Sequence, residues 1–153
     1  MHLLFVCAGN TCRSPMAEGI LKKTLRKNAI GDIVAKSAGV TAVQGEPANS
    51  QAMRVSRKHK VDLSAHSSQP VTAELMAWAD WVIAMTPDQR DSLRNSYPNK
   101  MSSIILLKEL GRPDPRPEDL EVKDPYGSDY WGYEHCFLEL EAEIERILPY
   151  LNG

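Results

Sequence analysis

The sequence has no excess of basic residues, no long apolar segment and few cysteines. Its 18 lysine and arginine residues are outnumbered by 20 aspartate and glutamate residues, which gives a formal net charge of −2. Proteins that bind nucleic acids or membrane surfaces usually carry a basic excess, so both classes are disfavoured. No apolar run approaches the roughly 20 residues of a membrane span, and no signal-peptide pattern precedes the first apolar segment. We therefore expect a cytoplasmic protein that binds neither nucleic acid nor membrane.

The three cysteines, Cys7, Cys12 and Cys136, do not form the cysteine framework of a small secreted protein. The four histidines are scattered along the chain, and Cys7 and Cys12 lack the close spacing of common zinc ligands. We expect neither a metal site nor a cofactor.

The alternation of short apolar runs with helical patterns indicates the fold class. At 153 residues, with 42% hydrophobic and 25% charged residues, the chain is most simply one globular domain spanning residues 1–153. The alternation predicts a three-layer α/β/α arrangement around a four-stranded parallel sheet. The predicted strands are residues 3–6, 33–35, 79–85 and 103–107, and the predicted helices are about 15–28, 48–58, 72–78, 86–95 and 130–151. Thr72 and Thr86 are the predicted N-caps of the third and fourth helices.

Two groups of charged residues are interpreted as solvated helix faces. The first group is Arg54, Arg57 and Lys58. The second lies on the last helix and comprises Glu139, Glu141, Glu143 and Glu145. Cys136 lies on the same helix and is interpreted as a packing residue.

The most informative stretch is residues 3–15, which combine a buried strand, a tight loop and the start of a helix. The apolar run of residues 3–6 leads into Cys7-Ala8-Gly9-Asn10-Thr11-Cys12-Arg13-Ser14-Pro15. We predict Ser14 as the N-cap and Pro15 as the first helical residue. Gly9 is expected to let the loop bend where a side chain would obstruct it. Such a loop presents unpaired backbone N–H groups, and the helix dipole strengthens its attraction for an anion.

Cys7 and Arg13 give this predicted anion site a chemical function. The planar guanidinium of Arg13 suits two oxygens of a phosphate. The same electrostatic field favours a thiolate at Cys7, and Ser14 could donate a hydrogen bond to it. The alternative is that Cys7 and Cys12 are ordinary buried small residues. The preceding strand and the following helix start favour phosphoryl transfer to the Cys7 sulfur.

Phosphoryl transfer also needs a proton for the leaving group, and two Asp-Pro pairs could supply it. Asp114-Pro115 lies in a polar, proline-rich run with no apolar neighbour. Asp124-Pro125 is followed by Tyr126 and a glycine, and leads directly into the last helix. We therefore predict Asp124 as the general acid.

The motif Val6-Cys7-x-Gly9-Asn10-x-Cys12-Arg13-Ser14-Pro15 resembles that of the low-molecular-weight protein tyrosine phosphatase family. Ser37-Ala38-Gly39, His66 and Asp124-Pro125-Tyr126-Gly127 follow in the family's order, so the resemblance covers essentially the whole chain. It implies a cysteine-dependent phosphatase that acts on phosphorylated protein side chains through a phosphocysteine intermediate. It also implies that Cys7, Arg13 and Asp124 are catalytic. The expected contacts to phosphate or substrate are Ala8, Gly9, Asn10, Thr11, Cys12, Ser14 and Tyr126.

The resemblance assigns supporting roles to two further residues and leaves one open. Ser37, interpreted here as part of the loop after the second strand, would brace the phosphate loop near Asn10, and His66 would brace the same loop. In the family, vicinal cysteines such as Cys7 and Cys12 protect the nucleophile through a reversible disulfide. Inert loop packing is the alternative for Cys12.

Thr11 bears on the choice of substrate. Family members that act on phosphotyrosine usually carry a bulky aliphatic residue here, whereas Thr11 resembles the subgroup that acts on phosphoarginine in proteins. A hydroxyl can hydrogen-bond to a guanidinium leaving group, and the smaller side chain leaves room for it. We favour phosphoarginine over phosphotyrosine, with the tolerated replacement of isoleucine by threonine as the alternative.

Other classes fit the residues less well. Arsenate reductases share the fold and loop but need further cysteines, and only Cys136 lies outside the loop. A non-catalytic phosphate-binding module would lack the nucleophile or the acid. A sugar-transport phosphocarrier would need neither Arg13 nor Asp124. The physiological substrates and the oligomeric state stay open.

Overall fold

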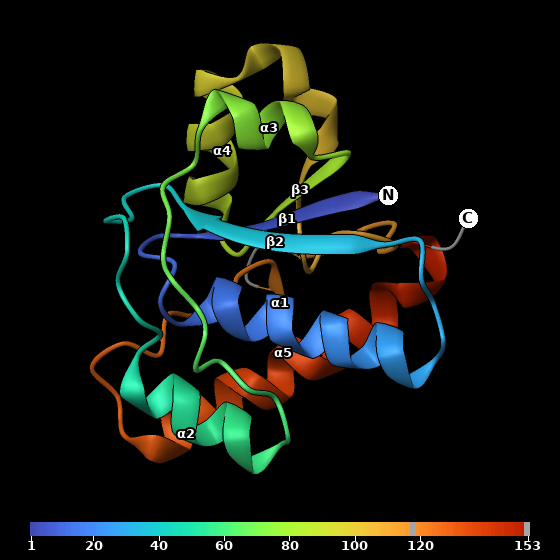
Figure 1. Ribbon diagram of the computed structural model, residues 1–153. Coiled ribbons are helices and arrows are strands. Elements are labelled where there is room, and N and C mark those ends of the chain that lie inside the picture. Colours follow the sequence, from blue (N-terminus) through green and yellow to red (C-terminus); the bar gives the residue numbers. More distant parts are fainter. Residues whose placement is uncertain (117–118, 152–153) are drawn as a thin grey trace.

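The protein forms one parallel sheet with helices on both faces (Figure 1). The computed structural model describes residues 1–116 and 119–151. The sheet order is β2–β1–β3–β4, with β1 at His2–Cys7, β2 at Val34–Gly39, β3 at Trp81–Ala84 and β4 at Ile104–Leu106. The helices are α1 (Arg13–Lys27), α2 (Ser50–Lys58), α3 (Ala73–Trp78), α4 (Pro87–Ser96) and α5 (Tyr130–Leu151), and a 3₁₀ helix, η1 (Pro98–Ser103), precedes β4. The predicted three-layer fold with four parallel strands is confirmed.

The two faces of the sheet are covered by different helices. Helices α1 and α5 lie on one face, with α2 packed against α5, while α3 and α4 lie on the other (Figure 1). Strand β1 serves both faces because its side chains alternate. Leu3 and Phe5 belong to the core beneath α1 and α5, and Leu4 and Val6 belong to the core beneath α3 and α4. This two-sided burial explains why the first apolar run is continuous.

The strand order places a crevice at the carboxyl ends of β1 and β3. The chain leaves β1 through α1 toward β2 on one side, and leaves β3 through α4 toward β4 on the other. Parallel sheets bind ligands where the connections diverge in this way. The loop after Cys7 starts at this position.

The second strand is longer than predicted. Ser37, Ala38 and Gly39 lie within β2 and not in a following loop, because they pair with Phe5, Val6 and Cys7 of β1. The third and fourth strands are shorter than predicted, since only Trp81–Ala84 and Ile104–Leu106 pair with neighbouring strands of the sheet.

The prediction that Ser14 caps the first helix is wrong. Helix α1 begins at Arg13, and Cys12 is its N-cap residue without a side-chain cap bond. The Ser14 hydroxyl is committed elsewhere, 2.9 Å from Cys7 Sγ. The two other predicted caps are confirmed: Thr72 accepts a hydrogen bond at the start of α3, and Thr86 does so at the start of α4.

The glutamate face of the last helix is less exposed than predicted. The apolar residues of this helix repeat at helical spacing; Phe137, Leu140, Ile144 and Ile147 are buried, and Leu148 is partly buried. Of the four glutamates, only Glu145 is exposed; Glu139 pairs with Lys108, and Glu143 pairs with two arginines. Within the described ranges, no helix is long and apolar enough to cross a membrane.

Candidate active site

The loop between β1 and α1 turns at Asn10. Asn10 has a φ of 56°, a left-handed conformation that asparagine tolerates better than most residues. Gly9 was predicted to permit the bend, but its φ is not left-handed, and a Cβ there would meet only Thr11 Oγ1, at 3.7 Å. Close approach instead requires glycine at Gly39, where a Cβ would lie 2.4 Å from the carbonyl oxygen of Ala8.

The buried side chain of Asn10 holds the loop in this conformation. Its Nδ2 donates to Ser14 Oγ at 2.8 Å and to Ser37 Oγ at 3.0 Å, and its Oδ1 accepts from the Gln69 backbone at 3.0 Å. His66 Nε2 lies 2.7 Å from the Asn10 carbonyl oxygen. Since a carbonyl only accepts, Nε2 is the donor. Ser37 and His66 therefore both contact Asn10, as the resemblance implied.

Two members of this network, Glu18 and Gln69, are not among the predicted site residues. Glu18 accepts a hydrogen bond from Ser37 Oγ at 2.7 Å, and Gln69 Nε2 donates to the Ser37 carbonyl at 3.0 Å. Glu18 lies one helical turn after Ser14, which places both on the same side of α1. That spacing was the only available clue, and it does not identify Ser37 as the partner.

The hydrogen-bond directions make Ser14 a donor to Cys7. Asn10 Nδ2 donates one hydrogen to Ser14 Oγ and the other to Ser37 Oγ. Ser14 Oγ is thus an acceptor in this bond, and its own hydroxyl hydrogen is free to be donated elsewhere. The nearest acceptor for that proton is Cys7 Sγ at 2.9 Å, whereas the Ala38 carbonyl lies at 3.4 Å. Cys7 is only 2% exposed. The Ser14 hydroxyl is therefore directed at the buried Cys7 sulfur.

A cavity of about 210 Å³ opens above the Cys7 sulfur. Its lining residues are Cys7, Gly9, Thr11, Cys12, Arg13, Asp124 and Tyr126. Within the described chain, the backbone N–H groups of residues 9–12 donate to no other protein atom. The cavity floor therefore offers unpaired donors of the kind that bind oxyanions.

Of the predicted contact residues, Gly9, Thr11 and Cys12 line the cavity, and the other four lie in three different positions. Asn10 and Ser14 lie beneath the cavity floor, where they support it. Ala8 does not line the cavity, and its carbonyl oxygen accepts a hydrogen bond from the Thr41 backbone at 3.0 Å. Tyr126, with 76% of its surface exposed, stands at the rim.

Arg13 is buried beside the cavity and held from one side. Its Nη1 donates to the Val122 carbonyl oxygen at 3.0 Å, and its Nη2 lies 3.5 Å from Asp124 Oδ2. Its buried Nε has no acceptor among the described residues. A buried donor without a partner is costly, so the guanidinium retains a donor suited to an oxyanion.

Asp124 reaches the cavity through a segment anchored just beyond β3. The Val122 backbone N–H donates to the Met85 carbonyl oxygen at 2.9 Å. This bond directs the chain past Arg13 and brings Asp124 to the cavity, with half of its side chain exposed. Asp124 Oδ1 then accepts from the Tyr126 backbone at 3.0 Å. The competing Asp114 is exposed and borders a different cavity.

The environment of Cys12 keeps its thiol protonated. Burial raises the pKa of Cys12 and outweighs the hydrogen bonds from Tyr133 and Thr11, which lower it. Tyr133 Oη lies 3.7 Å from the Cys12 sulfur, a contact from α5 that no sequence pattern indicated. Both loop cysteines are free thiols, and a disulfide between them under oxidation stays a prediction.

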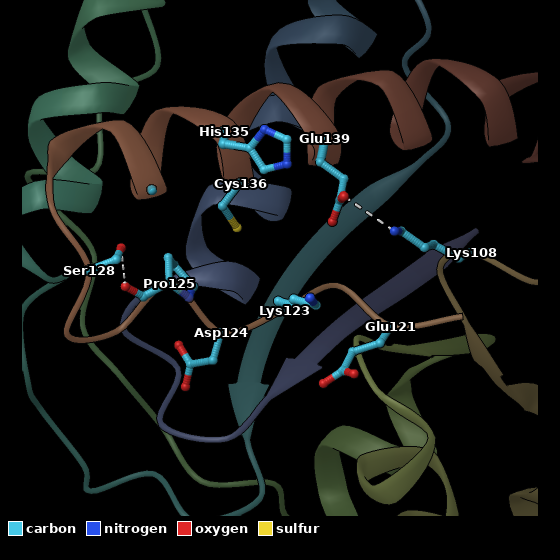
Figure 2. A pocket seen from close by; sticks show the side chains of 10 residues that line it. Lys108, Glu121, Lys123, Asp124, Pro125, Ser128, His135, Cys136 and Glu139 are labelled. Carbon is cyan, nitrogen blue, oxygen red and sulfur yellow. Dashed lines mark hydrogen bonds and ion pairs between the residues drawn. The ribbon is translucent and has the colours of Figure 1, made fainter. Parts of the chain in front are cut away.

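A larger cavity of about 370 Å³ lies on the other side of the Asp124 loop. Figure 2 shows His135, Cys136 and Glu139 of α5 above the Lys123–Pro125 segment that lines it. Burial raises the pKa of the Cys136 thiol to about 12, so this cysteine is a poor nucleophile near neutral pH. The smaller cavity is therefore the candidate active site, and Asp124 borders both.

The comparisons with known proteins agree with this geometry. The profile of the low molecular weight phosphotyrosine protein phosphatases matches residues 2–152. The chain belongs to this family. The low molecular weight phosphatases are protein phosphatases, so the chain is a hydrolase of that class, and the resemblance inferred from its motifs is confirmed.

Three relatives of this phosphatase are informative. The protein-arginine-phosphatase of Geobacillus stearothermophilus is 33% identical over 99% of this chain and 96% of the relative. The low molecular weight protein tyrosine phosphatase of T. tengcongensis has a TM-score of 0.90 and 37% identity, over 98% of this chain and 99% of that chain. A cysteine-to-serine mutant of YwlE arginine phosphatase, with a phosphorylated active-site serine, has a TM-score of 0.92 and 31% identity, over 100% of this chain and 97% of that chain.

Proposed function

We propose that the chain hydrolyses phosphorylated protein side chains through a phosphocysteine intermediate, with phosphoarginine as the favoured substrate. The observation that carries this proposal is the meeting of Cys7, Arg13 and Asp124 at one small cavity. A nucleophile, an anion-binding guanidinium and a proton donor are the groups that this chemistry requires. The phosphorylated active-site serine of the YwlE mutant supports an intermediate on the corresponding side chain.

In the first step, the Cys7 sulfur attacks phosphorus opposite the leaving group. The S–P bond forms while the P–N bond of phosphoarginine, or the P–O bond of phosphotyrosine, breaks. Arg13 and the loop N–H groups hold the non-bridging oxygens as charge develops on them. Asp124 gives its proton to the departing nitrogen or oxygen.

In the second step, water attacks the phosphocysteine. Asp124, now a carboxylate, accepts a proton from this water. The S–P bond breaks, which releases inorganic phosphate and returns the Cys7 thiolate, again stabilised by the Ser14 hydroxyl at 2.9 Å.

Thr11 supports phosphoarginine as the substrate. It lines the cavity, and its backbone carbonyl is held by Asn49 of the α2 cap at 2.9 Å. A threonine hydroxyl can accept a hydrogen bond from a guanidinium leaving group, whereas a bulky aliphatic residue would favour a phenol. Overall similarity does not choose between the two, since relatives of comparable identity are named for arginine and for tyrosine.

The decisive experiment compares kcat/KM for a phosphoarginine peptide and a phosphotyrosine peptide. We expect Thr11→Ile to lower the phosphoarginine-to-phosphotyrosine ratio about tenfold or more, because the hydroxyl is lost and the cavity narrows. Thr11→Val keeps the shape of threonine but removes its hydroxyl, so it separates the effect of the lost hydrogen bond from the effect of the larger isoleucine side chain. Cys7→Ser is the inactive control. A ratio unchanged by Thr11→Ile would make phosphotyrosine the better assignment.

A further inference from the structure

Three basic side chains gather on the exposed face of α2, beside the first turn of α5. Arg54, Arg57 and Lys58 are exposed and share one helix face through their i, i+3, i+4 spacing. A shallow depression of about 330 Å³ lies between them and Tyr130. Like charges at this spacing destabilise a helix, and the protein as a whole carries a formal net charge of −2. The helix dipole favours Arg57 and Lys58 in the last turn of α2, but Arg54 lies before that turn and gains no such stabilisation.

Arg54 is held in an orientation that suits anion binding. Its guanidinium carbon lies 5.0 Å from the centre of the Tyr130 ring, and its Nη1 donates to Gln51 Oε1 at 3.2 Å. A guanidinium stacked on an aromatic ring keeps its remaining N–H groups free at its edge. Less side-chain freedom is then lost when an oxyanion binds.

The arginines of this cluster have no carboxylate partner in the described part of the chain. Lys58 lies 3.3 Å from Glu134, which also binds His59 at 2.9 Å. No described carboxylate oxygen lies within ion-pair distance of Arg54 or Arg57. Arg57 influences Asp62 only as the smallest contribution to its lowered pKa, after hydrogen bonds from Ser64. Two guanidinium groups are thus left for an external anion.

The cluster adjoins the candidate active site through both of its elements. Asn49, the N-cap of α2, donates its backbone N–H to the Thr11 carbonyl oxygen at 2.9 Å. Tyr130 begins α5 directly after the loop that carries Tyr126 at the cavity rim. Figure 1 shows α2 beside that loop and the start of α5. Trp131 stands next to Tyr130 with 67% of its surface exposed.

We propose that this cationic surface, formed by Arg54, Arg57, Lys58, Tyr130 and Trp131, binds an acidic segment of the protein substrate beside its phosphorylated residue. The assignment rests on the proposed phosphatase function and defines its substrate class further. Carboxylates of the substrate segment pair with the guanidinium edges of Arg54 and Arg57. Trp131 offers an apolar contact to the part of the substrate segment that lies between those carboxylates. Charge complementarity selects an acidic over a basic segment.

The test uses two phosphoarginine peptides that differ only in their flanks, one with glutamates and one with glutamines, together with p-nitrophenyl phosphate. We expect wild type to favour the glutamate peptide through a lower KM, with a preference that decreases at high salt. The double substitution Arg54→Ala/Arg57→Ala should lower the glutamate-to-glutamine ratio of kcat/KM about three- to tenfold.

The matched control is Arg26→Ala/Lys27→Ala, which removes the same charge at the far end of α1, about 20 Å along the helix from the cavity. This control should retain the wild-type preference. An equal fall in the control, or an unchanged ratio in the Arg54→Ala/Arg57→Ala protein, would overturn the docking surface while phosphatase activity persists. Wild type that turns over none of the three substrates would overturn the proposed function itself, and the docking surface with it.

Discussion

Asn10 shows how much of the candidate site depends on one side chain. Its amide contacts Ser14, Ser37 and the Gln69 backbone while its own backbone takes the left-handed conformation. An aspartate at this position would lack the two amide donors, so Ser14 and Ser37 would lose the hydrogen bonds that orient them. The direction of the Ser14 hydroxyl toward Cys7 is therefore set by a residue that does not line the cavity.

Asp124→Asn tests the general acid at the residue scale. We expect kcat for poor leaving groups to fall about 10²- to 10³-fold, because the departing atom loses its proton donor. The measurement is kcat over a series of aryl phosphates of rising leaving-group pKa. Asp114→Asn makes the same chemical change in the competing Asp-Pro pair and should stay within about twofold of wild type. A larger loss in Asp114→Asn would reverse the assignment.

At the scale of elements, α5 combines core packing with contacts to the site. Its buried residues pack against α1, while Tyr133 lies 3.7 Å from the Cys12 sulfur. Tyr130, at its first turn, stacks under Arg54 of α2. The helix thus connects the phosphate loop and the cationic surface to the same core.

Leu140→Ala measures how much this packing contributes to stability. Leu140 is fully buried, and its truncation should lower the free energy of unfolding by about 2–4 kcal/mol through lost burial and a residual cavity. Leu138 on the same helix is 45% exposed, and Leu138→Ala should change it by less than about 0.5 kcal/mol. Urea denaturation of the two variants checks the difference, and equal effects would contradict the described orientation of α5.

At the scale of the whole molecule, an ion-pair cluster joins α5 to the segment after β4. Glu143 accepts from Arg112 Nη2 at 2.9 Å and from Arg146 Nε at 2.7 Å, and Arg146 Nη2 donates to the Leu107 carbonyl at 2.9 Å. Burial acts to raise the pKa of Glu143, but the hydrogen bonds from both arginines outweigh it and hold the pKa below its ordinary value of 4.5. The folded state therefore favours the carboxylate.

Glu143→Gln should make stability less dependent on acid pH. Because the folded-state pKa is lowered, the contribution of Glu143 is present above the ordinary glutamate pKa and is lost as the pH falls through the folded-state value. We expect a loss of about 1–2 kcal/mol at neutral pH that shrinks in acid. Thermal or urea unfolding across pH measures it. Glu145→Gln, an equal charge change at an exposed site, should show little effect, and parallel pH profiles for all three proteins would refute the argument.

Local patterns predicted the fold and the cavity-lining residues well. Buried parallel strands require continuous apolar runs, and the phosphate loop is contiguous in sequence. Short stretches of sequence are therefore enough to predict both the strands and the loop. The end of β2 was mistaken for a loop because Ser37 and Gly39 are selected by contacts with the phosphate loop, not by strand propensity. Glu18, Gln69 and Tyr133 reach the site through tertiary contacts between distant segments, and no local pattern encodes those.

Val122 has a consequence for how this enzyme responds to mutation. The residue positions the guanidinium of Arg13 with its carbonyl oxygen and anchors itself with its N–H, so both contacts belong to the main chain. Alanine scanning would register Val122 only as an apolar core position, because every replacement except proline retains both groups. A one-residue insertion or deletion in this segment would reveal its role. It would take the carbonyl acceptor away from Arg13 and displace Asp124 from the cavity at the same time.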